Sequence, residues 1–296
     1  MKNRFLFSAV VGWCCVLTSV LAATPAALLK FAAITDIQYA DKMAVSTRHY
    51  RNSPAKLARC AEELKRQQPA FIIHLGDLTD GRMTAAHNQE DVATITAAMK
   101  KIAGPWRFVL GNRDAAAGRQ LLTDALGFKD FYYEFTQPGV PGWRFVVLDG
   151  NDAGYGVVSE KQLAWFRGVL AQAQARNERV ICFCHFPLIA EASPRKHIMH
   201  KPAPVLEALD HATCVVAWFC GHDHEGGYAF RKGVHHLTLQ GTCETEDQPA
   251  MAIIRLFPDH LSVTGFGREP SRELPLGAEA APAAKSVPAE ALRPAA

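Results

Sequence analysis

The chain has 296 residues, of which 49% are hydrophobic and 21% charged, a composition typical of a soluble globular protein with one large domain or two small ones. The net charge of +3 excludes the strong basicity of a general nucleic-acid-binding protein, and the sequence contains no Lys/Arg-rich run or RNA-binding signature. We therefore expect no nucleic-acid partner.

The first 22 residues differ from the rest of the chain. Lys2 and Arg4 precede a stretch from Phe5 to Ala23 that carries no charge, and Val20 and Ala22 offer small residues before a cut. This pattern is typical of a secretory signal peptide over residues 1–22, so we expect export to the periplasm or out of the cell. The apolar stretch is long for a signal. The alternative is therefore an uncleaved N-terminal anchor, the one case in which we expect contact with a membrane.

Residues 28–275 alternate between apolar runs and helical patterns, which predicts an α/β domain. Buried strands are expected at 30–35, 70–75, 106–110, 143–149, 179–185 and 214–220. Helical patterns lie near 54–68, 88–101, 159–175 and 202–210, and Ser159 with Gln162 resembles a capping box. Strands at 234–240, 250–257 and 260–267 then follow without a helix between them. Residues 276–296 are rich in Ala and Pro, and we expect this tail to be disordered.

The cysteines that follow the predicted signal are Cys60, Cys182, Cys184, Cys214, Cys220 and Cys243. Most lie inside apolar runs, where an unpaired cysteine behaves as a small hydrophobic residue. No C-x-x-C pair indicates a zinc site. We therefore expect buried, free thiols.

Polar side chains follow five of the predicted strands at their carboxyl ends. They are Asp36, Gln38, Asp77, Asn112, His185, His222 and His224. Each one, taken singly, is typical of a turn, a helix cap or a structural histidine. Ligands of open α/β sheets collect at the carboxyl ends of strands, however, and independent turns have no reason to supply only side chains that bind metals. Carboxylate, amide and imidazole ligands suit manganese, iron or zinc. Their number exceeds one tetrahedral site, so two ions that share a carboxylate fit better.

The order of these residues resembles a known superfamily. The motifs D-x-Q, G-D-x-x-D, G-N-x-D, H-x-P and G-H-D-H occur in this sequence in the order of the calcineurin-like metallophosphoesterases. The first motif is usually D-x-H in that superfamily, whereas Gln38 stands here. That variant, together with YRNS (50–53), LGDLTDG, GHDHEGGY and GVHHLTLQG (233–241), resembles the manganese-dependent ADP-ribose/CDP-alcohol diphosphatases over residues 30–270.

The resemblance implies a four-layer α/β/β/α sandwich with two divalent ions, manganese first, with iron and zinc as alternatives. It places Asp36, Gln38, Asp77 and His224 around the first ion, and Asp77, Asn112, His185 and His222 around the second, so that Asp77 bridges. It also implies a hydrolase in which a hydroxide held between the ions attacks the diphosphate linkage of a nucleoside diphosphate-linked compound, such as ADP-ribose or a CDP-alcohol. The expected partner is thus a small nucleotide derivative.

Arg113 stands where the superfamily usually has histidine. A histidine can stabilise charge and also protonate a leaving oxygen, whereas arginine does not give up its proton at working pH. A basic alkoxide leaving group benefits from that proton, but a phosphate leaving group is far less basic and mainly needs its charge neutralised. Arg113 therefore favours a diphosphate substrate, whose oxygens it can bind in a fork, and Asp114 is expected to fix its neighbour.

Arg51 and Asn52, in YRNS, are candidates for substrate binding. Arg51 is expected to contact the distal phosphate or the sugar, with a solvated surface arginine as the alternative. Two other functions stay open at this point. One is a phosphodiesterase or phosphomonoesterase of the same superfamily. The other is a non-catalytic nucleotide-binding protein. The only support for this alternative is that Gln38 and Arg113 replace the usual histidines of the superfamily.

Overall fold

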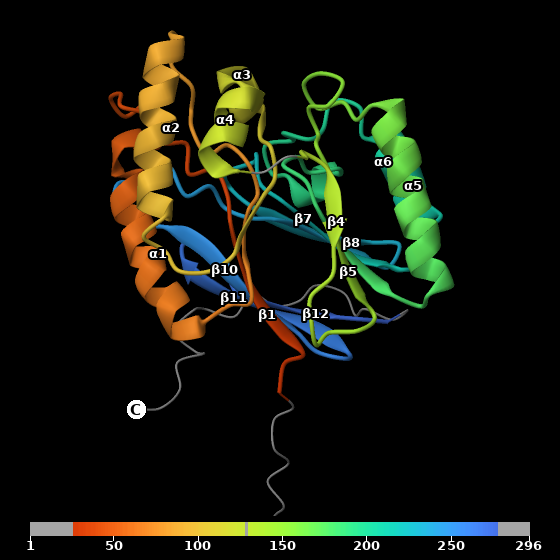
Figure 1. Ribbon diagram of the computed structural model, residues 1–296. Coiled ribbons are helices and arrows are strands. Elements are labelled where there is room, and N and C mark those ends of the chain that lie inside the picture. The colour runs from red at the N-terminus through yellow and green to blue at the C-terminus, as the bar shows by residue number, and fades with distance from the viewer. Residues whose placement is uncertain (1–25, 128–129, 278–296) are drawn as a thin grey trace, which may run out of the picture.

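Two six-stranded β-sheets lie face to face between two layers of helices (Figure 1). The computed structural model describes residues 26–127 and 130–277. The strand order of the first sheet is β12 (Arg272–Pro275), β11 (His260–Gly267), β10 (Ala250–Leu256), β1 (Leu29–Ile34), β2 (Ile72–His74) and β3 (Trp106–Phe108). The order of the second is β4 (Tyr133–Phe135), β5 (Trp143–Val147), β6 (Arg179–Phe183), β7 (Val215–Cys220), β9 (Val234–Thr238) and β8 (Gly227–Arg231). This is the predicted four-layer α/β/β/α sandwich.

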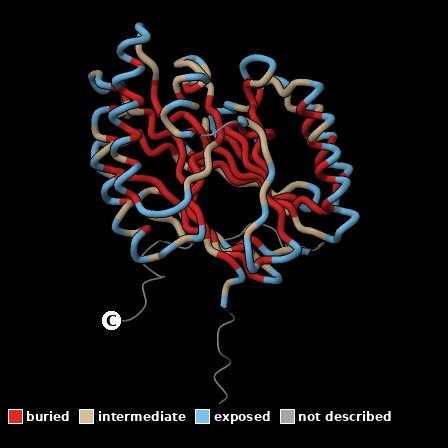
Figure 2. The backbone as a smooth tube through the Cα atoms, in the orientation of Figure 1, coloured by how far each residue is buried: buried red, intermediate tan, exposed pale blue. Residues whose placement is uncertain are grey.

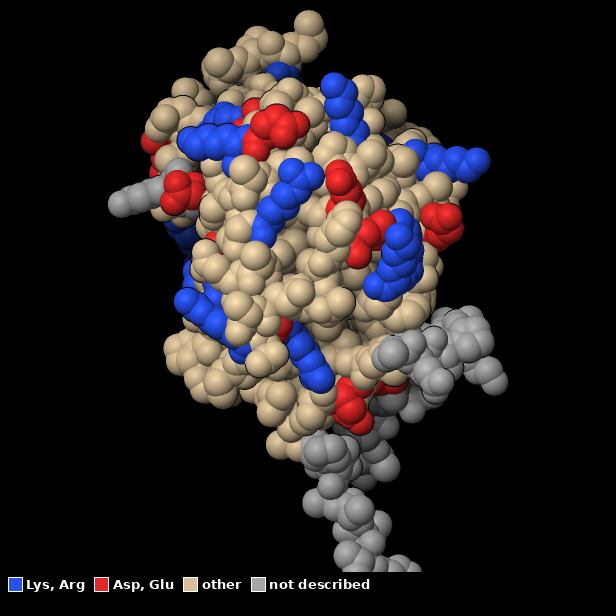
Figure 3. All heavy atoms as spheres, turned by 90° about the vertical axis from the view of Figure 1, so that its right-hand side faces the viewer, with Lys and Arg blue, Asp and Glu red and all other residues tan. Residues whose placement is uncertain are grey.

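Helices cover the outer face of each sheet (Figure 1). The first sheet carries α1 (Ser53–Gln67), α2 (Ala85–Met99), α3 (Asn112–Ala117) and α4 (Arg119–Leu126), and the second carries α5 (Glu160–Ala175) and α6 (Ala203–Asp210). The short 3-10 helices are η1 (Tyr50–Asn52) and η2 (Ala190–Ala192). Figure 3 shows charges of both signs interspersed on the face formed by α5 and α6, as in the pair of Arg167 with Glu207.

Three hydrophobic clusters fill the three spaces between the four layers. Along β1, Phe31 and Ala33 pack between the sheets, whereas Ala32 and Ile34 pack under the helices of the first sheet. The strand β6 alternates in the same way between the central cluster and the cluster beneath α5 and α6. Figure 2 shows that the strands are buried while exposed residues lie on the outer helices. Both faces of these strands are covered, which is why they read as continuous apolar runs.

Parallel strands bring their carboxyl ends to one edge of the sandwich. In the first sheet, β1, β2 and β3 are parallel, and in the second sheet β5, β6, β7 and β9 are parallel. The two edges meet, because the backbone amide of His222, after β7, donates to Asp36 Oδ2, after β1, at 2.9 Å. Polar residues that follow strands of either sheet are therefore neighbours.

The predicted strands correspond to β1, β2, β3, β5, β6, β7, β9, β10 and β11, and the predicted helices to α1, α2, α5 and α6. The capping prediction for α5 is confirmed, because Ser159 Oγ accepts a hydrogen bond from the amide of Gln162 at 3.2 Å. Sequence patterns missed β4, β8, β12, α3 and α4. The strand β4 has three residues and β12 has four, too few to show alternation. Gly118, with a φ of 123°, separates α3 from α4 and breaks one helical pattern into two short ones.

The cysteine prediction is confirmed for all six residues, which are buried and free. Within residues 26–127 and 130–277, no helix is long and apolar enough to cross a membrane. The signal peptide predicted at 1–22, and the tail from 278 to 296, lie outside the described residues.

Candidate metal centre

The seven strand-end residues of the sequence analysis come together at the edge where the two sheets meet. Asp36 and Gln38 follow β1, Asp77 follows β2 and Asn112 begins α3 just after β3. From the second sheet, His185 follows β6, and His222 and His224 follow β7. The first sheet therefore supplies the oxygen ligands and the second supplies the imidazoles.

Asp36, Gln38 and His224 form one half of the cluster. His224 Nε2 lies 3.1 Å from Asp36 Oδ1 and 3.1 Å from Gln38 Nε2. The Gln38 amide donates to Asp36 Oδ1 at 3.4 Å. In this orientation the NH₂ group of Gln38 faces the cluster. A cation would need Oε1 there, which a half-turn of the similarly shaped amide provides.

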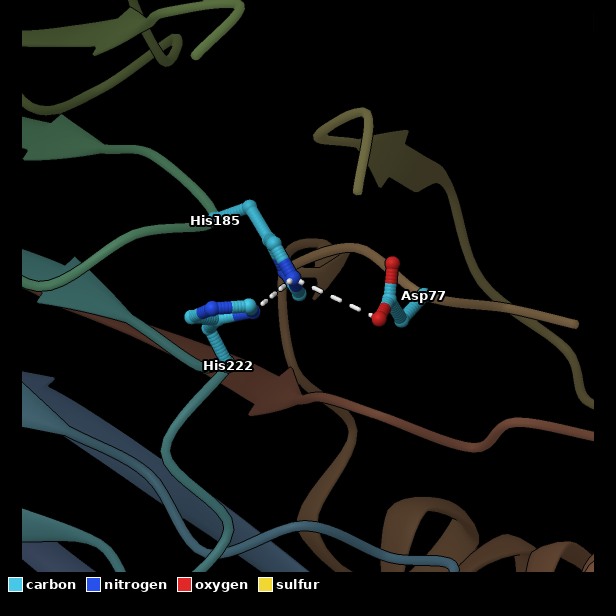
Figure 4. A group of neighbouring side chains, drawn as sticks. All are labelled: Asp77, His185 and His222. Carbon is cyan, nitrogen blue, oxygen red and sulfur yellow. Dashed lines mark hydrogen bonds and ion pairs between the residues drawn. The ribbon is translucent and has the colours of Figure 1, made fainter. Parts of the chain in front are cut away.

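Asp77, His185, His222 and Asn112 form the other half, and Figure 4 shows the first three of them. His185 Nε2 lies 3.5 Å from Asp77 Oδ2, 3.2 Å from His222 Nδ1 and 3.1 Å from Asn112 Oδ1. Asp77, His185 and His222 each offer a ligand atom, and these atoms all lie within 4.8 Å of one another. The donor atoms therefore converge on one point.

Asp77 joins the two halves. Its Oδ2 accepts a hydrogen bond from Gln38 Nε2 at 3.2 Å, on the side of the first half, and lies 3.5 Å from His185 Nε2, on the side of the second. Its Oδ1 accepts from the backbone amide of Arg113 at 2.8 Å, which fixes the carboxylate in place. Asp77 is thus the residue positioned to touch two ions at once.

Four of the seven residues have a left-handed backbone. The φ angles are 49° at Asp36, 42° at Gln38, 57° at Asp77 and 67° at His222. Residues other than glycine avoid this region, and strained backbone of this kind is concentrated at functional sites. The sharp turn after each strand points the side chain into the cluster instead of along the sheet.

Two glycines allow the strand ends to approach each other. A Cβ at Gly111 would overlap the backbone and carboxylate of Asp77, and a Cβ at Gly221 would overlap the side chain of Thr35 and lie 2.5 Å from Asp36 Oδ2. Any side chain at these positions would push apart the loops that carry the cluster. Close packing therefore explains why glycine occupies the first position of both the G-N and the G-H motif.

The electrostatics of the cluster favour a bound cation. Burial alone would raise the pKa of Asp36, but the charges of His224 and His185 and the hydrogen bonds to His224 and Thr35 together outweigh it, so the pKa is lowered. Burial would lower the pKa of His185, but the charges of Asp77 and Asp36, together with the hydrogen bonds to Asp77 and to the carbonyl of Leu75, outweigh it and raise the pKa to about 9. In the absence of metal, protons thus supply the positive charge that the buried carboxylates require. A metal ion must displace the proton of His185, so we expect metal affinity to rise with pH up to about 9.

The donor set fits divalent ions of the first transition row. The cluster offers two carboxylates, two side-chain amides and three imidazoles. Such a mixed set of ligands suits manganese, iron and zinc. Asp36 is fully buried and Asp77 is 1% exposed, and their ion-pair partners in the described chain are histidines, not Lys or Arg. Buried carboxylates without a permanent cation are what a metal site requires.

Glu244 is a residue of this site that sequence reasoning missed. Its Oε1 lies 2.7 Å from His224 Nδ1, on the opposite side of the ring from Asp36. Burial would raise the pKa of Glu244, but the hydrogen bonds to His224 and Thr47 and the charges of His224 and Arg48 together outweigh it and lower the pKa to about 2. Cys243 Sγ lies 3.4 Å from the same ring nitrogen. A carboxylate on Nδ1 fixes the histidine tautomer so that Nε2 is free for a ligand role.

Replacing Glu244 by Ala is expected to raise the manganese concentration for half-maximal activity about ten- to a hundredfold, as for other outer partners of metal-binding histidines. Glu244→Gln keeps an acceptor for Nδ1 and should recover much of the affinity. Glu273→Ala, on exposed β12, is the matched control. Equal manganese requirements in wild type and Glu244→Ala would show that the contact does not orient His224.

Asp114 holds the loops around the cluster. It is 2% exposed, and its Oδ1 accepts from the amide of Leu78 at 2.8 Å while Oδ2 accepts from the amide of Gly111 at 3.1 Å. Burial and the charge of Asp77 raise the pKa of Asp114 to about 7. These hydrogen bonds tie the segment after Asp77 to the start of α3, where Asn112 lies.

The other candidate residues lie at the rim. Arg113 is half-exposed, with its Nε 3.7 Å from Asp80 Oδ1. Arg51 is paired with Asp41 at 2.6 Å, and Asn52 donates to the backbone of Glu246 at 2.8 Å, so their hydrogen bonds go to loop residues and not to the cluster. A substrate role for Arg51 and Asn52 stays a prediction.

Tyr155 is a further rim residue without a sequence signal. It is 56% exposed, and its hydroxyl lies 3.0 Å from His222 Nε2. With Nε2 bonded to Tyr155, the Nδ1 atom of His222 faces His185 and the interior of the cluster. The tyrosine thus restrains the ring from the solvent side.

Comparison with known proteins agrees with this geometry. The sequence matches the family described as calcineurin-like phosphoesterase over residues 29–226, so the chain belongs to this family, whose members are metal-dependent hydrolases that use two metals. Among named relatives, it is similar to the manganese-dependent ADP-ribose/CDP-alcohol diphosphatase of Xenopus tropicalis, with 26% identity over 82% of this chain and 93% of that protein. The protein of the same name from Homo sapiens is 25% identical over 83% of this chain and 92% of its own length.

Solved structures share the fold. A dimetal phosphatase from Danio rerio has a TM-score of 0.77 at 24% identity. The match covers 85% of this chain and 100% of that one. A purple acid phosphatase from yellow lupin has a TM-score of 0.58 at 13% identity, covering 82% of this chain and 52% of that one. These similarities establish the metallophosphoesterase sandwich.

Proposed function

We propose that this protein hydrolyses the diphosphate linkage of small nucleoside diphosphate-linked compounds, such as ADP-ribose and CDP-alcohols, with manganese as the metal. The observation that carries the proposal is the seven-residue cluster with Arg113 at its rim, attached to Asp77 through its backbone amide at 2.8 Å. The relatives named as manganese-dependent ADP-ribose/CDP-alcohol diphosphatases support the substrate class and the metal.

The cluster residues have defined roles in this proposal. Asp36, Gln38, Asp77 and His224 would hold a first ion, and Asp77, Asn112, His185 and His222 would hold a second. When bound, two such ions lower the pKa of a water molecule and neutralise phosphate oxygens. Glu244 keeps Nε2 of His224 directed inward, and Asp114 keeps the loops of Asp77 and Asn112 together. These hydrogen bonds position the candidate ligands in the absence of a substrate.

Arg113 acts on the leaving group. Arginine remains protonated at working pH, so it neutralises charge on the departing phosphate but does not supply a proton. The second phosphate of a diphosphate is a weakly basic leaving group and accepts this form of assistance. The alkoxide that leaves an alkyl phosphodiester needs a proton, and Arg113 does not donate one at working pH. This difference favours diphosphates over the alternative of an alkyl phosphodiesterase.

We also propose that residues 1–22 direct export, so that the substrates are nucleotide derivatives outside the cytosol. N-terminal sequencing of the protein recovered from the periplasm or medium checks this. A mature chain that begins after Ala22 is expected, and recovery of the intact N-terminus in the membrane fraction would support the anchor instead.

The test of the proposed activity is a comparison of substrates with manganese. ADP-ribose and CDP-choline are expected to be cleaved faster than a dialkyl phosphodiester, with AMP and ribose 5-phosphate as products from ADP-ribose. Faster cleavage of the alkyl ester would favour the phosphodiesterase alternative. Binding of nucleotides without turnover of any phosphate compound would favour a non-catalytic binding protein.

A further inference from the structure

Two cations, Lys42 from the loop after β1 and Arg113 from the first turn of α3, converge on Asp80, a carboxylate to which the proposed mechanism gives no role. Lys42 Nζ contacts Asp80 Oδ2, and Arg113 Nε lies 3.7 Å from Oδ1. The side chain of Asp80 is 3% exposed, whereas those of Lys42 and Arg113 are 34% and 41% exposed. A buried carboxylate therefore holds two cations that still face solvent.

The three segments that carry these residues, two loops and the first turn of α3, are fixed to one another. Tyr39 and Thr79 form an isolated parallel bridge, and the amide of Asp80 donates to the carbonyl of Tyr39 at 3.1 Å. The backbone of Arg113 is bonded to Asp77 Oδ1 at 2.8 Å. Asp80 itself lies three positions after Asp77. The positions of both cations are thus set relative to Asp77, the residue that joins the two halves of the cluster.

The cations keep unused hydrogen-bonding capacity. Arg113 meets Asp80 through Nε, so its two terminal nitrogens have no hydrogen bond to the rest of the described chain. Asp80 Oδ1 accepts no hydrogen bond among the described residues. Lys42 Nζ lies 4.2 Å from the centroid of the Tyr50 ring, a cation–π contact that holds the ammonium group beside Asp80. A forked donor and a point charge are therefore both available to an anion.

The charge balance favours a phosphate as that anion. Lys42, Arg113 and Asp80 together leave one net positive charge at the edge of the cluster. A diphosphate has two charged phosphoryl groups, and the seven-residue cluster serves the one that is attacked. The other group needs a cation from the protein, and arginine with lysine suits phosphate oxygens. Without Asp80, two like charges would repel each other and separate.

We propose that Lys42 and Arg113, both held by Asp80, form a two-cation clamp for the departing phosphate of the substrate, with Asp80 as a positioning residue. This inference rests on the proposed diphosphatase function and extends it to Lys42 and Asp80. An ester with a single phosphorus and an uncharged leaving group gains nothing from the clamp. The clamp therefore acts on specificity for substrates that carry a second phosphate.

The test compares two substrates in the full-length protein with manganese. Lys42→Met is expected to lower kcat/KM for ADP-ribose about ten- to a hundredfold, the value of one charge-assisted hydrogen bond. It should change kcat/KM for bis(p-nitrophenyl) phosphate by less than about twofold, since that leaving group carries no phosphate. Lys42→Arg keeps the charge and should recover most of the ADP-ribose activity. Lys161→Met, on α5, is the matched control, and thermal melting checks that each variant is folded.

Asp80→Asn tests the positioning role. It keeps the size of the side chain but removes the charge that holds both cations, so KM for ADP-ribose should rise while turnover of bis(p-nitrophenyl) phosphate is retained. Parallel losses on both substrates would make Asp80 merely structural. Equal effects of Lys42→Met on the two substrates, or no effect on ADP-ribose, would overturn the clamp and leave the proposed function intact. A wild-type protein that cleaves the aryl ester but no diphosphate would overturn both.

Discussion

Replacing Asp77 by Asn is expected to lower kcat for ADP-ribose on the order of a thousandfold or more, because a metal supplies several kcal/mol of transition-state stabilisation and each 1.36 kcal/mol is tenfold in rate. Asp77 is the residue in contact with both halves of the cluster, through Gln38 and His185. The amide of Asn keeps an oxygen that can accept from the Arg113 backbone, so the loop should remain in place. What is lost is the negative charge that the two ions share.

The measurement is steady-state turnover over a manganese titration, with thermal melting in chelator as the check on folding. Asp210→Asn is the matched control, since Asp210 ends α6 and its ion pairs are with Arg231 and Lys232, which are not residues of the cluster. The control should keep wild-type turnover, and chelator should remove turnover from the wild type. A variant at Asp77 that reaches wild-type kcat at saturating manganese would show that this carboxylate does not bridge.

Replacing Arg113 by His is expected to raise the ratio of alkyl phosphodiester cleavage to ADP-ribose cleavage by roughly a hundredfold, the lower end of what general acid catalysis contributes. The imidazole can donate a proton to an alkoxide, which arginine does not do. It also loses the fork that binds a phosphate leaving group. Both changes move the ratio in the same direction, so the effect should be large.

The comparison requires kcat/KM for both substrates in the same buffer and metal. Arg113→Lys is the control variant, because it keeps the positive charge but gives neither the fork nor a proton donor suited to neutral pH. It should weaken ADP-ribose cleavage without improving the alkyl ester. An unchanged ratio in Arg113→His would remove Arg113 from the account of specificity.

The sequence was sufficient to predict the seven residues of the cluster because each follows an apolar run that forms a strand, buried in four cases and partly buried in β3. Such strands are readable as apolar runs, and the carboxyl-end rule then brings their polar successors together. The same rule applied to the strand at 234–240 would have drawn attention to Glu244, since β9 is parallel to β7.

Lys42 and Asp80 could not be paired from the sequence. They lie in different loops, 38 positions apart, and each on its own is an ordinary loop residue. Their contact depends on the bridge between Tyr39 and Thr79, a single pair without a strand pattern. Tyr155 is similar, because its neighbour His222 is 67 positions away. Pairings of this kind depend on how loops close over the sheets, which local periodicity does not encode.

The division of the cluster between the two sheets has a thermodynamic consequence. Its oxygen donors come from one sheet and its imidazoles from the other, so ions bound between them connect the two halves of the sandwich as cross-links that form only in the folded chain. A ligand that binds the native state alone stabilises it by about 2.7 kcal/mol at a hundred times its dissociation constant. The melting temperature of this protein should therefore depend on free manganese, and metal starvation would cost it structural robustness as well as activity.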